Sequence, residues 1–228
     1  MEKILLTVFA VCVLSIVPSQ AMEIGKSVGV SMSMNALDTT LTDDIDNNGT
    51  VTTTKDIADD VSMPSLFGEL NLKGDRAVLT VGLDWIPFGG ELHTRSTTQS
   101  TLGAIAAGAA SSGTNRGTLD VSNHMTWYIQ PGAMITDNTM LYLSWGSISA
   151  DTEATYNSVS SGSKTVEQTL DGETVGFGIK KFNDSGGFIR LEYAATDYDK
   201  ISVTTAGSTK VTADADSTRL TLSLGKSF

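Results

Sequence analysis

The C-terminal segment of the chain, from Arg219 to Phe228, alternates between apolar and polar residues. Leu220, Leu222, Leu224 and Phe228 share one parity, whereas arginine, threonine, serine and glycine occupy the other. Because side chains in a β-strand point alternately to opposite faces, this pattern gives one apolar face and one polar face. The segment is therefore predicted to be a strand between lipid and water.

The same alternation recurs along the chain, and it predicts eight strands separated by turn residues. The predicted strands are Ile24–Met34, Ser65–Lys73, Arg76–Ile86, Thr118–Gln130, Thr139–Ser149, Glu173–Phe182, Gly187–Tyr198 and Ser217–Phe228. Short connections at 74–75, 136–138 and 183–186 alternate with long ones at 37–63, 87–117, 150–172 and 200–216. The short connections are rich in glycine, asparagine and aspartate, which tolerate tight turns.

The alternation of short and long connections predicts the fold class. It is all-β: a transmembrane antiparallel up-and-down β-barrel with short periplasmic turns and long extracellular loops. Aromatic residues at the strand ends are predicted to anchor the barrel at the two membrane interfaces. These residues are Phe182, Phe188 and Phe228 at the periplasmic side, and Trp85 and Phe88 at the extracellular side. A soluble lipocalin-like barrel would have the reverse pattern, with its apolar residues inside.

Turn length predicts the register of two hairpins. A two-residue turn at 74–75 places Glu69 opposite Thr80. A five-residue turn at 183–187 places Lys180 opposite Arg190. Each register pairs polar residues with polar residues, which supports the assignment of faces.

The central hairpin contains Pro131 and Gly132 near its predicted periplasmic end. Because proline has no backbone N–H for the ladder, we expect a β-bulge there.

The N-terminal segment has the features of a secretory signal peptide. Lys3 precedes an apolar run from Ile4 to Val17, and small residues at Ser19 and Ala21 predict cleavage after Ala21. Residues 1–21 are thus expected to be removed, and 22–228 to form the barrel domain. A lipoprotein signal at Cys12 is less consistent with the sequence, because the preceding residues lack the required small side chain. Cys12 is the only cysteine of the chain, so the processed protein would have neither disulfides nor thiol chemistry.

The terminal Phe228, the strand count and the asymmetry of the connections together resemble the small eight-stranded outer-membrane β-barrels of Gram-negative bacteria, such as the membrane domain of outer-membrane protein A. The resemblance implies a location in the bacterial outer membrane, in contact with its lipid and lipopolysaccharide, as a monomer. It also implies that the barrel-assembly machinery recognises Phe228 as an assembly signal. A net charge of −11 argues against nucleic acid as a partner.

The predicted register directs a set of ionisable side chains toward the barrel interior. These are Glu69, Asp84, His124, Lys180, Arg190, Glu192 and Arg219. Carboxylates and strong cations are equal in number, and the lumen of an eight-stranded barrel is narrow enough for side chains to fill. Mutual pairing would close the lumen. The alternative is a narrow pore lined by the same groups.

The first long connection contains a partial EF-hand pattern. Asp44, Asp46 and Asn48 occupy the first three oxygen-ligand positions, and Thr50 follows the glycine at position six. Lys55 stands where the motif needs a bidentate acid, so any Ca²⁺ site is expected to be weak. The alternative is an ordinary acidic turn, and no other cofactor is predicted.

The sequence gives little support for catalysis. His124 lacks the neighbouring serine of a lipid A deacylase pattern, and His93 stands alone in a predicted loop. We therefore expect a non-enzymatic protein with a structural or surface-interaction role, exerted through long acidic extracellular loops. A small porin-like channel is the main alternative, and a lipid-modifying enzyme is a weaker one.

Overall fold

The computed structural model describes residues 23–44, 53–99, 113–158, 162–204 and 210–228. The predicted signal peptide lies outside these residues. All elements of the described chain are antiparallel strands: β1 Glu23–Asp44, β2 Thr53–Lys73, β3 Ala77–Ile86, β4 Gly90–Gln99, β5 Gly113–Thr136, β6 Thr139–Ser158, β7 Gly162–Phe182, β8 Gly187–Tyr198, β9 Ile201–Thr204 and β10 Lys210–Ser227.

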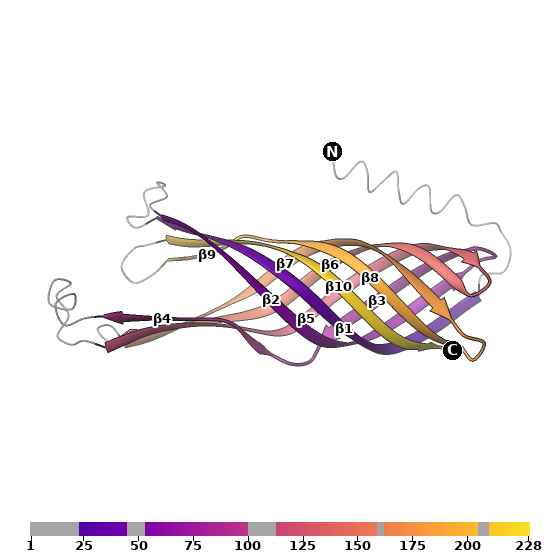
Figure 1. Ribbon diagram of the computed structural model, residues 1–228, viewed down its shortest axis with the longest axis horizontal. Helices are drawn as coiled ribbons and strands as arrows, with labels where there is room; N and C mark the ends of the chain where they lie inside the picture. Colours follow the sequence, from indigo (N-terminus) through magenta and orange to yellow (C-terminus); the bar gives the residue numbers. More distant parts are fainter. Residues whose placement is uncertain (1–22, 45–52, 100–112, 159–161, 205–209) are drawn as a thin grey trace.

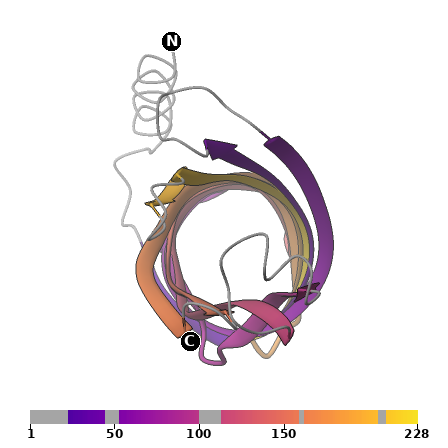
Figure 2. The same ribbon diagram turned by 90° about the vertical axis from the view of Figure 1, so that its left-hand side faces the viewer.

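Eight of these strands form a closed ring. Their order is β1, β2, β3, β5, β6, β7, β8 and β10, and pairing of β1 with β10 closes the barrel (Figures 1 and 2). The remaining strands, β4 and β9, each pair with one neighbour only, β5 and β10 respectively. The prediction of an eight-stranded antiparallel barrel is therefore confirmed.

The register of one predicted hairpin is confirmed and that of the other is wrong. Lys180 lies opposite Arg190, as the turn at 183–187 predicts. Glu69, however, lies opposite Gly82 rather than Thr80. The turn is longer than predicted, because the Gly74 N–H donates to the Ala77 carbonyl at 2.8 Å. The resulting shift is two residues, so every side chain keeps its predicted face.

The bulge predicted at Pro131 and Gly132 is also wrong. The register between β5 and β6 is the same on both sides of Pro131, and it shifts instead between Ser122 and Met125 and between Met134 and Thr136. Asn123 has a φ of 51°, a left-handed conformation that accommodates the first of these irregularities. No bulge residue is inserted at Pro131. The β5–β6 ladder has no pair at Gln130 or Pro131, so proline's missing N–H interrupts the ladder without shifting its register.

The long connections predicted outside the membrane are mostly strand. β1 continues to Asp44, β2 starts at Thr53, and β5, β6 and β7 are prolonged in the same direction. These segments are rich in threonine, which has high β-propensity, and their polar character had suggested loops. Figure 1 shows the result as two arms at one end of the barrel, one built from β1, β2, β9 and β10 and the other containing β4 and β5.

The two faces of the ring differ in polarity. On β10, Leu220, Leu222 and Leu224 point outward and are about half exposed, whereas Thr221 and Ser223 point inward and are buried. Large apolar side chains are exposed on the outer face of all eight ring strands. This apolar outer face matches a barrel surrounded by lipid. No helix of the described residues has the length and apolarity that would let it cross a bilayer.

The predicted aromatic anchors are only partly correct. Trp85, Phe88 and Phe228 are exposed as expected. Phe182 and Phe188, by contrast, lie opposite one another on the inner face, where their ring centroids are 5.5 Å apart. Their parity places them in the lumen, so they fill space there instead of reaching the membrane interface.

Candidate functional site: the charged lumen

The barrel interior contains a cluster of three charged side chains from strands far apart in sequence. Glu69 of β2 binds both Lys180 of β7 and Arg190 of β8. Its Oε2 accepts from Lys180 Nζ at 2.8 Å, and its Oε1 accepts from an Arg190 terminal nitrogen at 2.7 Å. The side chains of all three are at most 4% exposed. We call Glu69, Lys180 and Arg190 the lumen triad.

The lumen triad brings two cations to one carboxylate. Lys180 and Arg190 are direct cross-strand neighbours, so their like charges would repel without Glu69. Aromatic faces also contact the cations: Lys180 Nζ lies 4.7 Å from the ring centroid of Phe188, and the Arg190 guanidinium carbon lies 4.4 Å from that of Phe67. Such cation–π contacts partly replace the water that these charges have lost.

A second carboxylate, Glu192, organises the neighbouring layer. Its Oε2 accepts from the Tyr142 hydroxyl and the Gln130 amide, each at 2.9 Å. Its Oε1 lies 3.5 Å from an Arg219 terminal nitrogen. The Tyr128 hydroxyl belongs to the lumen triad's own network: it donates to Glu69 at 3.1 Å and accepts from Arg190 at 3.4 Å. Together, the two adjacent layers draw side chains from β2, β5, β6, β7, β8 and β10.

Lumen-facing glycines make room for the aromatic rings of this network. Four aromatic side chains each lie directly opposite a glycine on the adjacent strand, and a Cβ at any of these glycines would overlap the ring. The pairs are Phe67 with Gly29, Tyr128 with Gly82, Tyr142 with Gly178 and Phe188 with Gly225. The rings cover the neighbouring strands and fill the lumen around the charged groups.

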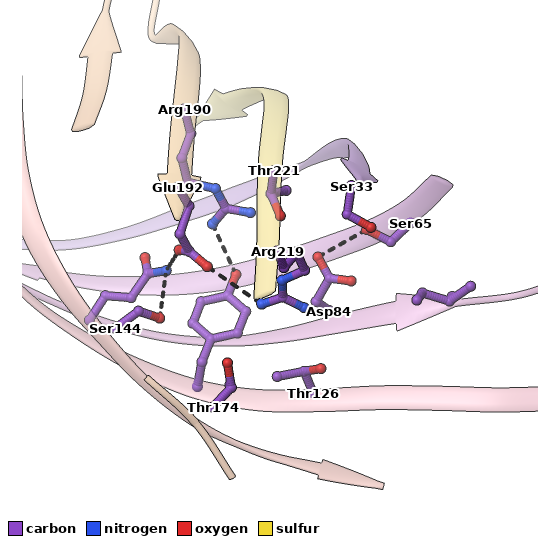
Figure 3. Close-up of a pocket in the computed structure, with 13 residues that line it drawn as sticks. Ser33, Ser65, Asp84, Thr126, Ser144, Thr174, Arg190, Glu192, Arg219 and Thr221 are labelled. Carbon is purple, nitrogen blue, oxygen red and sulfur yellow. Dashed lines mark hydrogen bonds and ion pairs between the residues drawn. The ribbon is translucent and has the colours of Figure 1, made fainter. Parts of the chain in front are cut away.

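On the side of the arms, Arg190 of the lumen triad lines a small polar cavity (Figure 3). Asp84 lies on its wall and accepts from the Ser65 hydroxyl at 3.0 Å. Several buried polar atoms of the wall have no hydrogen-bond partner among the described residues: Thr126 Oγ1, Gln130 Oε1, Arg219 Nε and Thr221 Oγ1. A cavity with this lining favours ordered water.

The structure separates the seven predicted lumen residues into groups. Glu69, Lys180 and Arg190 form the triad, Glu192 and Arg219 form a looser pair, and Asp84 lies on the cavity wall. His124 is also buried, but it lies opposite Ile86 beside the β5 irregularity, and its Nδ1 has no hydrogen-bond partner within the part of the chain that the structure describes.

Sequence reasoning missed Tyr128, Gln130 and Tyr142, which donate hydrogen bonds to the buried carboxylates of Glu69 and Glu192. Their parity along β5 and β6 would have identified them as inward-facing.

The remaining predicted site residues are the four of the acidic motif and Phe228. Asp46, Asn48 and Thr50 fall outside the described residues, and Asp44 is the last residue of β1, opposite Lys210. Within the described ranges, no three histidine, cysteine, aspartate or glutamate residues form a group suited to a metal ion. Phe228 closes the ring at the other end, because its N–H and carbonyl bond to the backbone of Lys26 at 2.8 and 3.1 Å.

A closed ring with an apolar outer face and a charged interior is the arrangement that permits strands to cross a bilayer. The fold is that of an outer-membrane β-barrel. No family model and no curated protein matches the chain.

Solved structures with a similar fold are outer-membrane proteins. The attachment invasion locus protein Ail of Yersinia pestis matches with a TM-score of 0.49 and 11% identity, covering 91% of this chain and 100% of that one. The outer-membrane protease OmpT of Escherichia coli matches with a TM-score of 0.40 and 8% identity, covering 92% and 100%. At this level of similarity, the architecture rests on the strand pairing and exposure of the chain itself.

Proposed function

We propose that this protein is a non-enzymatic outer-membrane barrel with a closed lumen, whose prolonged strands form a surface for interactions outside the cell. The observation that carries the proposal is the lumen triad, in which Glu69 joins Lys180 and Arg190 across the interior. With the turns on the periplasmic side, the arms project from the cell surface. Contacts with lipopolysaccharide, recognition by the assembly machinery and a monomeric state belong to the same proposal.

Closure of the lumen follows from the energetics of buried charges. A permeating ion would have to separate Glu69 from its partners, and breaking a buried ion pair typically costs about 3–5 kcal/mol. The aromatic rings of Phe67 and Phe188 occupy the space beside the pair. The path through the barrel is therefore blocked by these rings and by charged side chains that neutralise one another.

Conductance in planar lipid bilayers tests the closed lumen. The refolded wild-type protein should give no steady current. Replacing all three triad residues with alanine should create channels, provided that the variant still shows the altered gel mobility of a folded barrel. The matched control replaces three exposed acids, Glu153, Glu167 and Asp171, with alanine and should stay silent. Steady ohmic currents from the wild type would overturn the proposal.

A shortened arm tests whether the strand extensions serve the surface or the fold. Ala150 and Leu170 are directly opposite in β6 and β7, so an Asn-Gly turn can replace residues 151–169. The shortened protein should insert and fold as the wild type does, because the ring below is unchanged. Failure to fold would assign the extensions a role in barrel stability instead of surface interaction.

A small channel is the second candidate function, and the polar cavity beside Asp84 and Arg219 favours it. Its unpartnered polar atoms indicate a hydrated space in the half of the lumen nearer the arms. The conductance measurement distinguishes a hydrated cavity that is closed at one end from a continuous pore. The non-enzymatic assignment belongs to the proposal and rests on the sequence patterns alone.

A further inference from the structure

The arm built from β1, β2, β9 and β10 has β2 at one edge, and this edge has no neighbouring strand in the described chain. The ladder between β2 and β3 ends at Leu66 and Trp85, although β2 continues to Thr53 on its β1 side. After β3 ends at Ile86, the chain forms β4, which pairs with β5 and not with β2. A seam therefore opens between β2 and β4. We call Thr54–Ser62 the β2 edge.

The hydrogen-bond pattern identifies the backbone groups that face this seam. Lys26 exchanges both of its backbone bonds with Phe228, so even-numbered residues of β1 bond β10 and odd-numbered ones bond β2. The registers on both sides of β1 are unbroken, and they pair odd-numbered residues of β1 with odd-numbered residues of β2. Even-numbered residues of β2 thus direct N–H and C=O toward the seam. Pro64 has this parity, as expected for a residue without an N–H to donate.

The two faces of the β2 edge have different chemistry. Asp56 and Asp60 are exposed on the outer face, and Asp38 of β1 lies opposite Ala58, between them. On the inner face, the aliphatic side chains of Ile57 and Val61 are half-buried, and the half-buried Asp59 lies between them. A strand added at this edge would therefore meet carboxylates on its outer side, and on its inner side two aliphatic groups that flank the carboxylate of Asp59.

We propose that the β2 edge binds an extended segment of another protein, with lysine or arginine outward and aliphatic residues inward. The inference rests on the proposed role of the arms as an interaction surface. Main-chain bonds to the seam-facing groups supply the pairing, and the alternating side chains select the partner. A second copy of this chain does not fit, because its own Asp56 and Asp60 would face the same carboxylates.

A synthetic peptide tests the proposal on the refolded full-length barrel in detergent micelles. The probe is Lys-Val-Lys-Val-Lys-Val-Lys with blocked ends, and the readout is amide hydrogen exchange by NMR. The peptide should slow exchange at seam-facing amides such as those of Asp56, Ala58 and Asp60. The corresponding peptide with glutamate for lysine should have no effect. Unchanged exchange at these amides in the presence of bound lysine peptide would overturn the proposal, since it would mean adsorption by charge alone.

Two variants separate backbone pairing from electrostatics. Ala58→Pro removes a seam-facing N–H without breaking the ladder to β1, and should weaken peptide binding about fivefold, the effect of roughly 1 kcal/mol. Asp56→Asn with Asp60→Asn should weaken it about as much by removing charge complementarity. Unchanged affinity in both variants would also contradict the proposal.

The matched control neutralises two acids on the outer wall far from the seam. Glu173 of β7 and Asp197 of β8 are directly opposite one another, and Glu173→Gln with Asp197→Asn should leave peptide binding unchanged. An equal loss in this control would show that binding follows net charge alone. Conductance is independent of the seam. If the wild-type barrel gave no current and the peptide did not slow amide exchange, only the β2-edge proposal would be refuted. If the barrel conducted and the peptide slowed amide exchange at the β2 edge, only the closed lumen would be refuted.

Discussion

Tyr128 of β5 lies directly opposite Gly82 of β3, and its ring occupies the space that a side chain at position 82 would need. The same ring donates its hydroxyl to Glu69. The absence of a side chain at Gly82 therefore positions a hydrogen-bond donor for the lumen triad. Packing and charge are therefore coupled at this cross-strand pair.

Gly82→Ala should destabilise the barrel. The added methyl would force the Tyr128 ring away, with an overpacking cost of about 1–3 kcal/mol, and would weaken its bond to Glu69. Gly68 is the matched control, because it faces outward and a Cβ there meets open space. Urea unfolding in lipid vesicles, followed by tryptophan fluorescence, measures both. Equal stability of the two alanine variants would contradict the packing argument.

Glu69→Gln should cost about 3–5 kcal/mol, because Lys180 and Arg190 would remain buried as uncompensated neighbours. Adding Lys180→Met should recover part of the loss, since it removes one of the two repelling charges. The exposed Glu153→Gln provides a control for the same chemical change outside the lumen. If the double variant were less stable than Glu69→Gln alone, repulsion between the cations would not be the cause.

Four acidic residues on neighbouring strands form a row of like charges on the outer wall. Asp38, Asp216, Asp197 and Glu173 are successive cross-strand partners, and all are exposed. The nearby Lys200 is bound to Asp214 at 2.6 Å. The pKa of Lys200 is raised by its hydrogen bond to Asp214, by the charge of Asp214, and then by Asp197 and Asp216.

Asp216→Asn should stabilise the arm by about 0.2–1 kcal/mol for each like-charge contact it removes. The gain should be larger at low salt and should largely vanish at high salt, because exposed charges are screened. Amide exchange of β8 and β10 at two ionic strengths measures it. Asp184→Asn in the turn at the other end is the control for net charge. A gain that is independent of salt would rule out electrostatic repulsion as its source.

The alternation of side chains predicts the ring strands and their faces, because one side of each is lipid and the other is a narrow polar lumen. Register is predictable where turn length is unambiguous, as it is for Lys180 and Arg190. It fails at Glu69, where the turn includes two more residues than the sequence suggested. Even there the charged groups face inward, because a shift of two preserves parity.

The arms were not predictable by the same reasoning. Outside the membrane both faces of a strand meet water, so the contrast between apolar and polar positions weakens. Thr39 and Thr40 were assigned to a loop, yet both pair with β2 and β10. The triad geometry also depends on contacts between β2, β7 and β8, which only the closed ring brings together. Parity identified its members but not their partners.

Phe228→Ala should lower the yield of folded protein in cells while leaving refolding of the purified protein nearly unchanged. The ring of Phe228 is 74% exposed, and the bonds that close the barrel come from its backbone, which alanine retains. A loss confined to cells would therefore reflect recognition during assembly instead of stability. Ile24→Ala is the matched control, because Ile24 is an apolar residue near the same end of the barrel and is 68% exposed. The measurement compares heat-modifiable gel mobility after expression with that after refolding into lipid. An equal loss in both settings would assign Phe228 a structural role, and an equal loss for Ile24→Ala would attribute the effect to exposed apolar area at this end of the barrel.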